Sequence, residues 1–462
     1  DSESGKTKVL FEETSETQLN LMSNGDMWPS FVPLPDTNEL LWYSERSGWA
    51  HLYLYDLNTG ELKNSVTEGE WLVRDVVTVN PQRREAFIQT ACRSSGRNPY
   101  YRDLAKVHID TGELTTLASS DHDYFAGAFT DMQGFGASGL SRQCLDKRGM
   151  SPSGNFGVIT QSRVDTLPES IVVDDRGNHV MTLELTELVG APDGWKLPEP
   201  VAMKAADGST DIYGVVYRPS NFSPEKSYPV INDTFSTPDF PWMSIGSFDN
   251  SFFEGQSFYT AAALAELGFI VVQIEGRGAS YRENAFKEAD YGNLQLPTMR
   301  ADQVAGLQQL IERYSYMDGD RVGIHESQGG PSVLHGMLDY HDFYKVGVTN
   351  MPHDARLMSA SMWGDMYEGV DRHKEFYPED KLKNLQGKLL ISGGMLDVCT
   401  PPAGVFRLVE ALQKANKDFD MLLLPNQGHW FAPYLVRRAW DYFVLHLLDE
   451  EPPADFCLSG LF

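Results

Sequence analysis

The sequence predicts an all-β region followed by an α/β region with a mostly parallel sheet, and three observations lead to this expectation. Up to about residue 190, short strand-like segments alternate with turn signals. From about residue 198, strand-like runs alternate with helical ones. The chain has 462 residues, whereas a domain usually has roughly 50–250. We therefore expect two domains, one over residues 1–195 and one over residues 196–462.

A strand-turn-strand pattern recurs in the first region. Residues 52–56 lead into Asn-Thr-Gly-Glu-Leu, and residues 107–110 lead into Thr-Gly-Glu-Leu, at an offset of 111 − 59 = 52 residues. A weaker form of the same pattern lies at residues 171–178, with its glycine 65 residues after the second one (177 − 112 = 65). Hairpin periods of about 40–50 residues are typical of β-propeller blades, which bury their faces by stacking on neighbours. The pattern predicts a β-propeller portion of about four blades. Unrelated hairpins that share Thr-Gly turns are the alternative.

The elements of the second region can be placed in order. A hairpin around Asp207-Gly208 comes first. Apolar residues at i, i+3, i+4 and i+7 then indicate one face of a later helix. Alternation of strands and helices predicts a mostly parallel sheet with helices on both faces. The expected strands cover residues 228–233, 269–274, 321–325, 389–392 and 421–424, and the expected helices cover 259–267, a segment from about 331, 405–412 and 435–448.

Composition and charge exclude several function classes. Asp and Glu total 65 against 38 Lys and Arg, so the formal charge of −27 argues against binding to nucleic acid. No run of about 18 apolar residues predicts a membrane span, and the first ten residues lack the apolar segment of a signal peptide. The four cysteines at 92, 144, 399 and 457 lie far apart, which predicts neither a zinc site nor a dense disulfide framework.

Ser327 is the candidate nucleophile. It follows the expected strand 321–325 and precedes Gln328, Gly329 and Gly330. A serine on a sharp strand-to-helix turn needs small neighbours for clearance, and the two glycines provide it. Position 325, two residues before the serine, is His instead of the usual Gly, so a serine that merely caps a helix is the alternative. His325 and Glu326 could form a second acid/base pair, yet residues at the end of a core strand usually serve packing and hydrogen bonding.

Asp397 and His429 complete a candidate triad. Each lies in a loop that leaves the carboxyl end of an expected strand, and the chain order is Ser, Asp, His. That order is the one found in α/β-hydrolases, in which the histidine takes the serine proton and the aspartate holds the histidine tautomer. Taken singly, the two residues would be a loop or cap acid and a surface histidine. Together with Ser327 they predict an α/β-hydrolase catalytic domain.

Four segments carry a resemblance to a known family. They are residues 44–56 with Ser-Glu-Arg-Ser-Gly-Trp, 268–278 with Glu-Gly-Arg-Gly, 320–324, and 425–429 with Pro-Asn-Gln-Gly-His. The chain resembles the prolyl oligopeptidase family of serine peptidases in its dipeptidyl peptidase IV branch. This resemblance implies a β-propeller joined to an α/β-hydrolase domain, a short peptide as substrate, and no metal or organic cofactor. It also implies that Trp363 lines an apolar pocket for the residue before the scissile bond, whereas a plain core aromatic is the alternative.

The chain departs from the family pattern at several positions. A tyrosine that donates to the oxyanion is replaced by Phe235, which leaves the backbone N–H of Gln328 as a donor. The strand-to-helix turn that carries Ser327, the nucleophile elbow, is one residue shorter than in the family pattern. Cys399 stands where an asparagine usually helps to bind the peptide carbonyl. A peptidase is therefore the leading hypothesis. A turnover-deficient peptidase-like binding protein and an esterase or amidase are the alternatives.

The family's propellers also have more blades than the four expected here. By this resemblance the propeller is incomplete. Either the sequence is a truncated or processed piece, or a second chain or a homo-oligomer completes the ring and is a partner besides the peptide. The resemblance favours a periplasmic or secreted location over a cytoplasmic one. His353 and His373 have no metal-ligand companions at useful spacing, so no metal site is expected.

Overall fold

The computed structural model describes most of the chain, which divides into two compact units. The described residues are 5–19, 31–126, 149–151, 153–235, 238, 241–247, 252–326, 332–352, 361–369, 379–429 and 432–458. Unit 1 comprises residues 1–188, 245–254 and 280–288, and unit 2 comprises 189–244, 255–279 and 289–462. The first break thus lies seven residues before the expected boundary at 195 (195 − 188 = 7), and two short segments of the second region belong to unit 1.

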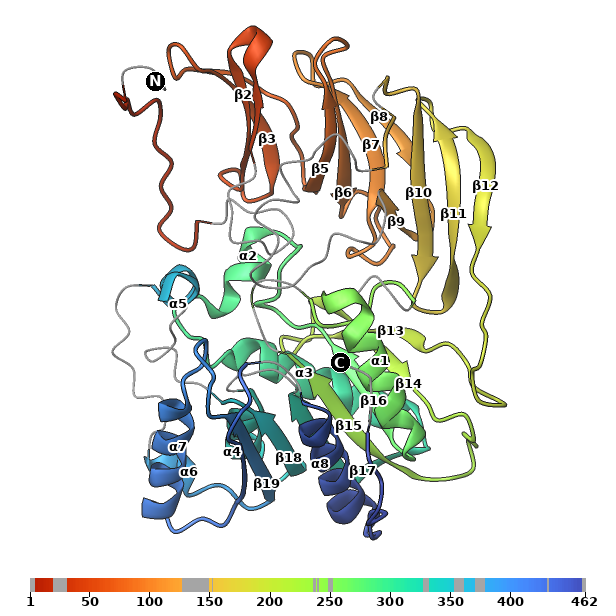
Figure 1. The fold of residues 1–462 in the computed structure, drawn as a ribbon, viewed down its shortest axis with the longest axis vertical. Coiled ribbons are helices and arrows are strands. Elements are labelled where there is room, and N and C mark those ends of the chain that lie inside the picture. The colour runs from red at the N-terminus through yellow and green to blue at the C-terminus, as the bar shows by residue number, and fades with distance from the viewer. Residues whose placement is uncertain are drawn as a thin grey trace. The chain divides into compact units, whose positions relative to one another are not determined.

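The described residues of unit 1 form three antiparallel four-stranded sheets (Figure 1). About four were expected, because a period of about 40–50 residues per blade divides the first 190 residues into roughly four. The first sheet holds β1 (Phe31–Leu34), β2 (Glu39–Ser44), β3 (His51–Asp56) and β4 (Leu62–Ser65), with a 3-10 turn η1 (Pro35–Thr37); the second holds β5 (Leu72–Asn80), β6 (Glu85–Ala91), β7 (Asp103–His108) and β8 (Leu114–Ala118); the third holds β9 (Asp123–Ala126), β10 (Phe156–Arg163), β11 (Thr166–Asp174) and β12 (His179–Leu185).

The repeated sequence pattern marks the same turn in each sheet. Gly60, Gly112 and Gly177 all lie between the third and fourth strands, and their φ angles are +81°, +72° and +83°. Glycine adopts such angles without steric cost. A Cβ atom at Gly60 would also lie 2.0 Å from the carbonyl oxygen of Leu10. The recurring glycine therefore reflects backbone conformation and close packing at equivalent places.

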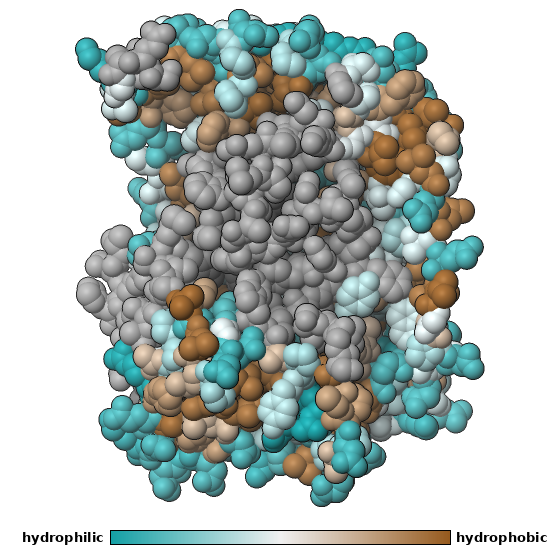
Figure 2. Space-filling model, in the orientation of Figure 1, coloured by the Kyte–Doolittle hydropathy of each residue, from teal (hydrophilic) through white to brown (hydrophobic). Residues whose placement is uncertain are grey.

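The outer strand of the third sheet is apolar and exposed. Figure 2 shows apolar side chains along the edge of the view where Figure 1 draws β12, and Val180, Met181, Leu183 and Leu185 are about half exposed or more. The pairing of β12 with β11 shifts register twice. Such bulges increase the local twist and make an edge strand a poorer template for further pairing.

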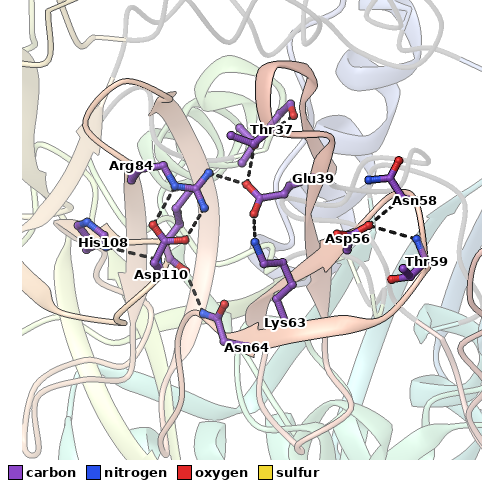
Figure 3. A network of polar contacts seen from close by, with 12 residues as sticks. Thr37, Glu39, Asp56, Asn58, Thr59, Lys63, Asn64, Arg84, His108 and Asp110 are labelled. Atoms are coloured by element: carbon purple, nitrogen blue, oxygen red, sulfur yellow. Dashed lines mark hydrogen bonds and ion pairs between the residues drawn. The ribbon is translucent and has the colours of Figure 1, made fainter.

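A buried carboxylate links the first two sheets of unit 1 (Figure 3). Glu39 on β2 is 2% exposed and accepts hydrogen bonds from Arg84 Nη1 at 2.6 Å and from Lys63. Arg84, in the turn before β6, also donates to Asp110 at 2.8 Å. Burial alone would raise the pKa of Glu39, but the hydrogen bonds from Lys63, Thr37 and Arg84 outweigh it and lower the pKa.

We expect Glu39→Gln to destabilise the protein by about 1–3 kcal/mol, because the partly buried Arg84 and the exposed Lys63 then lose the buried carboxylate that they share. Urea unfolding of the variant and the wild type measures this difference. The matched control is Glu410→Gln, which removes an exposed pair with Lys414 and should leave stability unchanged. Equal midpoints for Glu39→Gln and wild type would show that the Glu39 network does not stabilise unit 1.

Unit 2 is organised around an eight-stranded sheet with the order β13-β14-β16-β15-β17-β18-β19-β20. The β13–β14 and β14–β16 pairs are antiparallel, and all later pairs are parallel. The strands are β13 (Glu199–Lys204), β14 (Asp211–Tyr217), β15 (Tyr228–Thr234), β16 (Ile270–Ile274), β17 (Met317–Glu326), β18 (Tyr344–Asn350), β19 (Lys388–Gly394) and β20 (Asp420–Leu424).

Helices cover both faces of this sheet. A Cβ atom at Gly323 on β17 would lie 3.0 Å from the ring of Phe443 in α8, whereas Ile324 lies against Gly336 of α4 on the other face. None of the helices in the described ranges is long and apolar enough to cross a bilayer. The helices of the described residues are α1 (Phe252–Glu266), α2 (Asn284–Lys287), α3 (Pro297–Arg313), α4 (Ser332–Asp339), α5 (Ser361–Glu368), α6 (Glu379–Leu382), α7 (Pro402–Lys414) and α8 (Pro433–Phe443), with a 3-10 turn η5 (Glu288–Asp290) and a π-helical turn η7 (Val444–Leu448). Of these, α2 belongs to unit 1.

Candidate active site

The candidate catalytic residues follow three strands of the parallel part of the sheet. β17 ends at Glu326, directly before Ser327 in the sequence, whereas Asp397 and His429 lie in the loops after β19 and β20. Since parallel strands point the same way, their carboxyl ends share one edge of the sheet, where α/β proteins usually bind ligands. Ser327 and Gln328 themselves lie outside the described residues.

Backbone contacts hold the loops after β19 and β20 together. The N–H of Met395 donates to the carbonyl oxygen of Leu424 at 3.0 Å, and the N–H of Leu396 donates to that of Gln427 at 2.9 Å. A Cβ atom at Gly394 would lie 2.4 Å from the Gln427 carbonyl oxygen, so only glycine permits this approach. The glycines at the end of β19 therefore bring the two loops, and the candidate residues on them, into contact.

Asp397 and His429 form a hydrogen bond. Nδ1 of His429 lies 2.9 Å from Oδ2 of Asp397, which is 4% exposed. Burial acts to raise the pKa of Asp397, but hydrogen bonds from His429 and Thr400 outweigh it and lower the pKa. An ionised carboxylate only accepts, so Nδ1 of His429 carries a proton, and in the neutral imidazole Nε2 is then the acceptor nitrogen. This is the tautomer that a general base for a serine hydroxyl requires.

Thr400 is a part of the site that the sequence did not single out. Its hydroxyl lies 2.7 Å from Asp397 Oδ2 and 3.2 Å from His429 Nδ1, and its N–H donates to Asp397 Oδ1 at 2.8 Å. The N–H of Cys399 donates to the same Oδ1 at 2.8 Å. An Asp followed three residues later by Thr, just before a helix, is typical of a turn closed by a side-chain carboxylate. This Asp-x-x-Thr spacing is the sequence signal from which the contact between Thr400 and Asp397 could have been predicted.

Of the other candidate residues, Phe235 and Trp363 lie apart from this pair in the sequence, whereas Cys399 is two residues after Asp397. Phe235 directly follows β15 and packs on Trp242, with ring centroids 5.6 Å apart. Trp363 lies in α5. Burial raises the pKa of the Cys399 thiol. Across the described ranges no group of three or more His, Cys, Asp or Glu side chains is placed to hold a metal ion; His353 and His373 lie outside those ranges.

A buried acid anchors the segment that carries Trp242. Glu275 directly follows β16, is 4% exposed, and accepts the N–H of Met243 at 2.6 Å. Burial raises the pKa of Glu275 to about 7, against backbone hydrogen bonds from Met243 and Trp242 that lower it. The carboxyl is therefore protonated in the folded protein over a pH range in which the unfolded chain has lost that proton.

This difference predicts a stability that falls with rising pH. Between the model value of 4.5 and the raised value of about 7, the folded state binds one proton more than the unfolded state, so the free energy of unfolding decreases as pH rises, by up to about 3 kcal/mol. Urea unfolding at pH 5 and pH 8 measures the change, which Glu275→Gln should remove and the exposed control Glu312→Gln should retain. An equal pH dependence in Glu275→Gln and wild type would contradict the assignment.

Comparison with known proteins identifies relatives of both regions. Residues 255–450 match the model of the prolyl oligopeptidase family, and residues 1–143 match that of the dipeptidyl peptidase IV N-terminal region. Dipeptidyl peptidase 8 of Homo sapiens is 29% identical over 95% of this chain and 50% of its own length. Dipeptidyl peptidase 4 of Trichophyton equinum is 25% identical over 77% of this chain and 43% of its own. The chain thus spans about half the length of these relatives or less.

Solved structures support the fold. A putative dipeptidyl aminopeptidase IV from Bacteroides ovatus superposes with a TM-score of 0.74 at 22% identity, over 91% of this chain and 59% of the other. Dipeptidyl peptidase 4 of Porphyromonas gingivalis gives 0.70 at 21% identity, over 90% and 55%. The chain thus has an amino-terminal β region and a carboxyl-terminal hydrolase domain. It belongs to the prolyl oligopeptidase family, in the branch of dipeptidyl peptidase IV.

Proposed function

We propose that this protein is a serine peptidase that hydrolyses short peptides through Ser327, Asp397 and His429. The observation that carries the proposal is the 2.9 Å hydrogen bond between His429 and the buried Asp397. Ser327 follows the central strand β17 in the sequence, as a nucleophile on an α/β-hydrolase elbow would. Chain order and the mostly parallel sheet support an α/β-hydrolase core. The three four-stranded sheets of unit 1 support a partial β-propeller.

In the proposed reaction, Oγ of Ser327 attacks the scissile carbonyl carbon while Nε2 of His429 takes the hydroxyl proton. Asp397 holds the imidazole in the required tautomer and stabilises the imidazolium. The C–N bond then breaks, His429 returns the proton to the leaving amine, and an acyl-enzyme remains on Ser327. Water activated by His429 hydrolyses this ester, which restores the serine hydroxyl. No step requires a metal or an organic cofactor.

The oxyanion site would be weaker than in a complete family member. The backbone N–H of Gln328 is one proposed donor, whereas the side chain of Phe235 has none to offer. Loss of one donor typically costs about 10²–10³ in kcat. We therefore expect slow turnover, unless another N–H group takes the place of the missing hydroxyl.

For the substrate, the names of the relatives indicate release of dipeptides. We propose an apolar pocket lined by Trp363, which suits proline or alanine before the scissile bond, with Cys399 near the peptide carbonyl. Phe235 favours a second candidate, a turnover-deficient protein that binds peptides without cleaving them. The two candidates differ in whether product forms when peptide is bound.

A substrate panel with a fluorophosphonate probe tests the proposal. The panel contains chromogenic dipeptides with proline or alanine before the scissile bond, the same peptides with blocked amino termini, and simple esters. Covalent labelling by the probe and release from free-amino dipeptides are the expected results. Cleavage of esters alone would favour an esterase. Peptide binding with neither labelling nor product would establish the binding protein and overturn the peptidase.

A further inference from the structure

A row of buried polar side chains crosses the centre of the unit 2 sheet. Asp233 on β15 lies in register with His325 on β17, and Nδ1 of His325 is 2.8 Å from Oδ1 of Asp233. On the other side, Nε2 of Gln273 on β16 donates to Oδ2 of Asp233 at 2.9 Å. Asp233 and Gln273 are 0% exposed and His325 is 5% exposed. The three side chains therefore form one hydrogen-bonded row across three neighbouring strands.

Further contacts fix each member of this row. Nε1 of Trp242 donates to Oδ2 of Asp233 at 3.0 Å, so the carboxylate accepts three N–H donors. Oε1 of Gln273 accepts from the hydroxyl of Tyr217 at 3.2 Å, which orients its NH₂ group toward Asp233. The ring of His325 packs edge-on against Phe443 of α8 at 5.8 Å. Polar groups buried this completely and bonded this fully hold their positions.

The row lies one residue before the ends of the two strands that lead into the proposed active site. Phe235, at the oxyanion position, is two residues after Asp233, and Ser327 is two residues after His325. Trp242, which bonds to Asp233, also packs on Phe235. One side-chain hydrogen bond therefore couples the strand end before the nucleophile to the strand end before the oxyanion loop.

We propose that the Asp233–His325 pair is a positioning device, which sets the distance between the nucleophile turn and the oxyanion loop. This inference rests on the proposed function. The pair takes no part in proton transfer to substrate, because both side chains are buried in the layer between the sheet and α8. Attack geometry is sensitive to shifts of about 1 Å, which can cost about 10² in rate. A bond between the two strand ends restricts such shifts.

The test compares His325→Leu with His325→Asn. Leucine removes the N–H donor and leaves the buried Asp233 carboxylate with one partner fewer, whereas the asparagine amide can still donate to Asp233. We expect His325→Leu to lower kcat about 10²-fold with KM nearly unchanged, and His325→Asn to recover most of this loss. Asp233→Asn should lower kcat similarly, and it serves as the test if His325→Leu does not fold.

A matched control removes a different buried hydrogen bond from the same sheet. Nδ2 of Asn232, the neighbour of Asp233, donates to the hydroxyl of Tyr344 at 2.9 Å, and both residues are 0% exposed. Because neighbouring side chains on a strand point to opposite faces, Tyr344→Phe disturbs the other face. We expect Tyr344→Phe to lower the unfolding midpoint without changing kcat. Equal losses of kcat in Tyr344→Phe and His325→Leu would overturn the positioning role.

Separate measurements test the positioning role of the Asp233–His325 pair and the proposed function. In proton NMR spectra, a downfield imidazole N–H signal should disappear in His325→Leu and persist in His429→Ala, whatever the activity. A wild type that neither labels nor turns over peptide overturns the proposed function, and with it the role of the pair. An active wild type whose kcat survives His325→Leu within about twofold overturns the positioning role alone.

Discussion

Replacing Ser327 with alanine is expected to lower kcat by about 10⁶ and to abolish covalent labelling by a fluorophosphonate. The reason is that the acyl-enzyme route needs an oxygen nucleophile at this position, and direct attack by water gains only from binding and the oxyanion donors. The KM for a dipeptide substrate should change little, because the serine hydroxyl contributes mainly to the transition state. Single-turnover kinetics and mass spectrometry of the labelled protein measure both effects.

The matched control for this variant is Ser332→Ala. Ser332 begins α4 five residues later (332 − 327 = 5), and its buried hydroxyl lacks a hydrogen-bond partner among the described residues. Its loss should alter neither labelling nor kcat. Labelling that persists in Ser327→Ala would assign the nucleophile to another residue and end the triad hypothesis.

Asp397→Asn should reduce kcat by about 10⁴ while the fold is retained. Oδ1 of Asp397 accepts the backbone N–H groups of Cys399 and Thr400, so an asparagine would keep its oxygen there and present its NH₂ group to His429. The imidazole would then lose the acceptor that holds Nδ1–H and would adopt the wrong tautomer. Thr400, which donates to Asp397 Oδ2 at 2.7 Å, would also lose a charged acceptor. Steady-state kinetics with the preferred dipeptide measure the effect.

Asp420→Asn provides the comparison for this second substitution. Asp420 begins β20 and accepts the hydroxyl of Tyr442 at 2.9 Å, at the opposite end of the strand from the loop that carries His429. The Asp420→Asn substitution should leave kcat unchanged, and so should a chelator added to the wild type. If the rate survived Asp397→Asn and fell with the chelator, the proposed serine mechanism would be wrong and a metal-dependent one would replace it.

Several elements could be predicted because their signals are local. Gly60, Gly112 and Gly177 repeat a turn that needs positive φ, and they mark the same connection in three sheets. The apolar face of α7 was predicted from helical spacing, and all four of its residues, Val405, Leu408, Val409 and Leu412, are buried. The boundaries of the strands expected in unit 2 also agree within a few residues, except that β17 begins at Met317, four residues before the expected Arg321 (321 − 317 = 4). β18 (Tyr344–Asn350) was not among the expected strands.

Other features depend on contacts between distant segments. Residues 245–254 and 280–288 lie within the second region of the sequence yet belong to unit 1, which no local pattern could indicate. The contact between the loops after β19 and β20 requires Gly394 because a carbonyl oxygen approaches it from 33 residues away (427 − 394 = 33). The hydrogen bond between His325 and Asp233 could not be predicted either, because Asp233 lies 92 residues earlier in the chain.

The order of the two regions, the family and the three residues proposed for catalysis could be predicted from the sequence, because turn chemistry, strand and helix periods and motif order are local properties of the chain. Which side chains meet depends on the tertiary structure. It brings Asp397 to His429 and Thr400, and Asp233 to His325, Gln273 and Trp242. Hydrogen bonds form within about 3 Å, and only the packing of parallel strands brings residues so far apart in sequence to that distance.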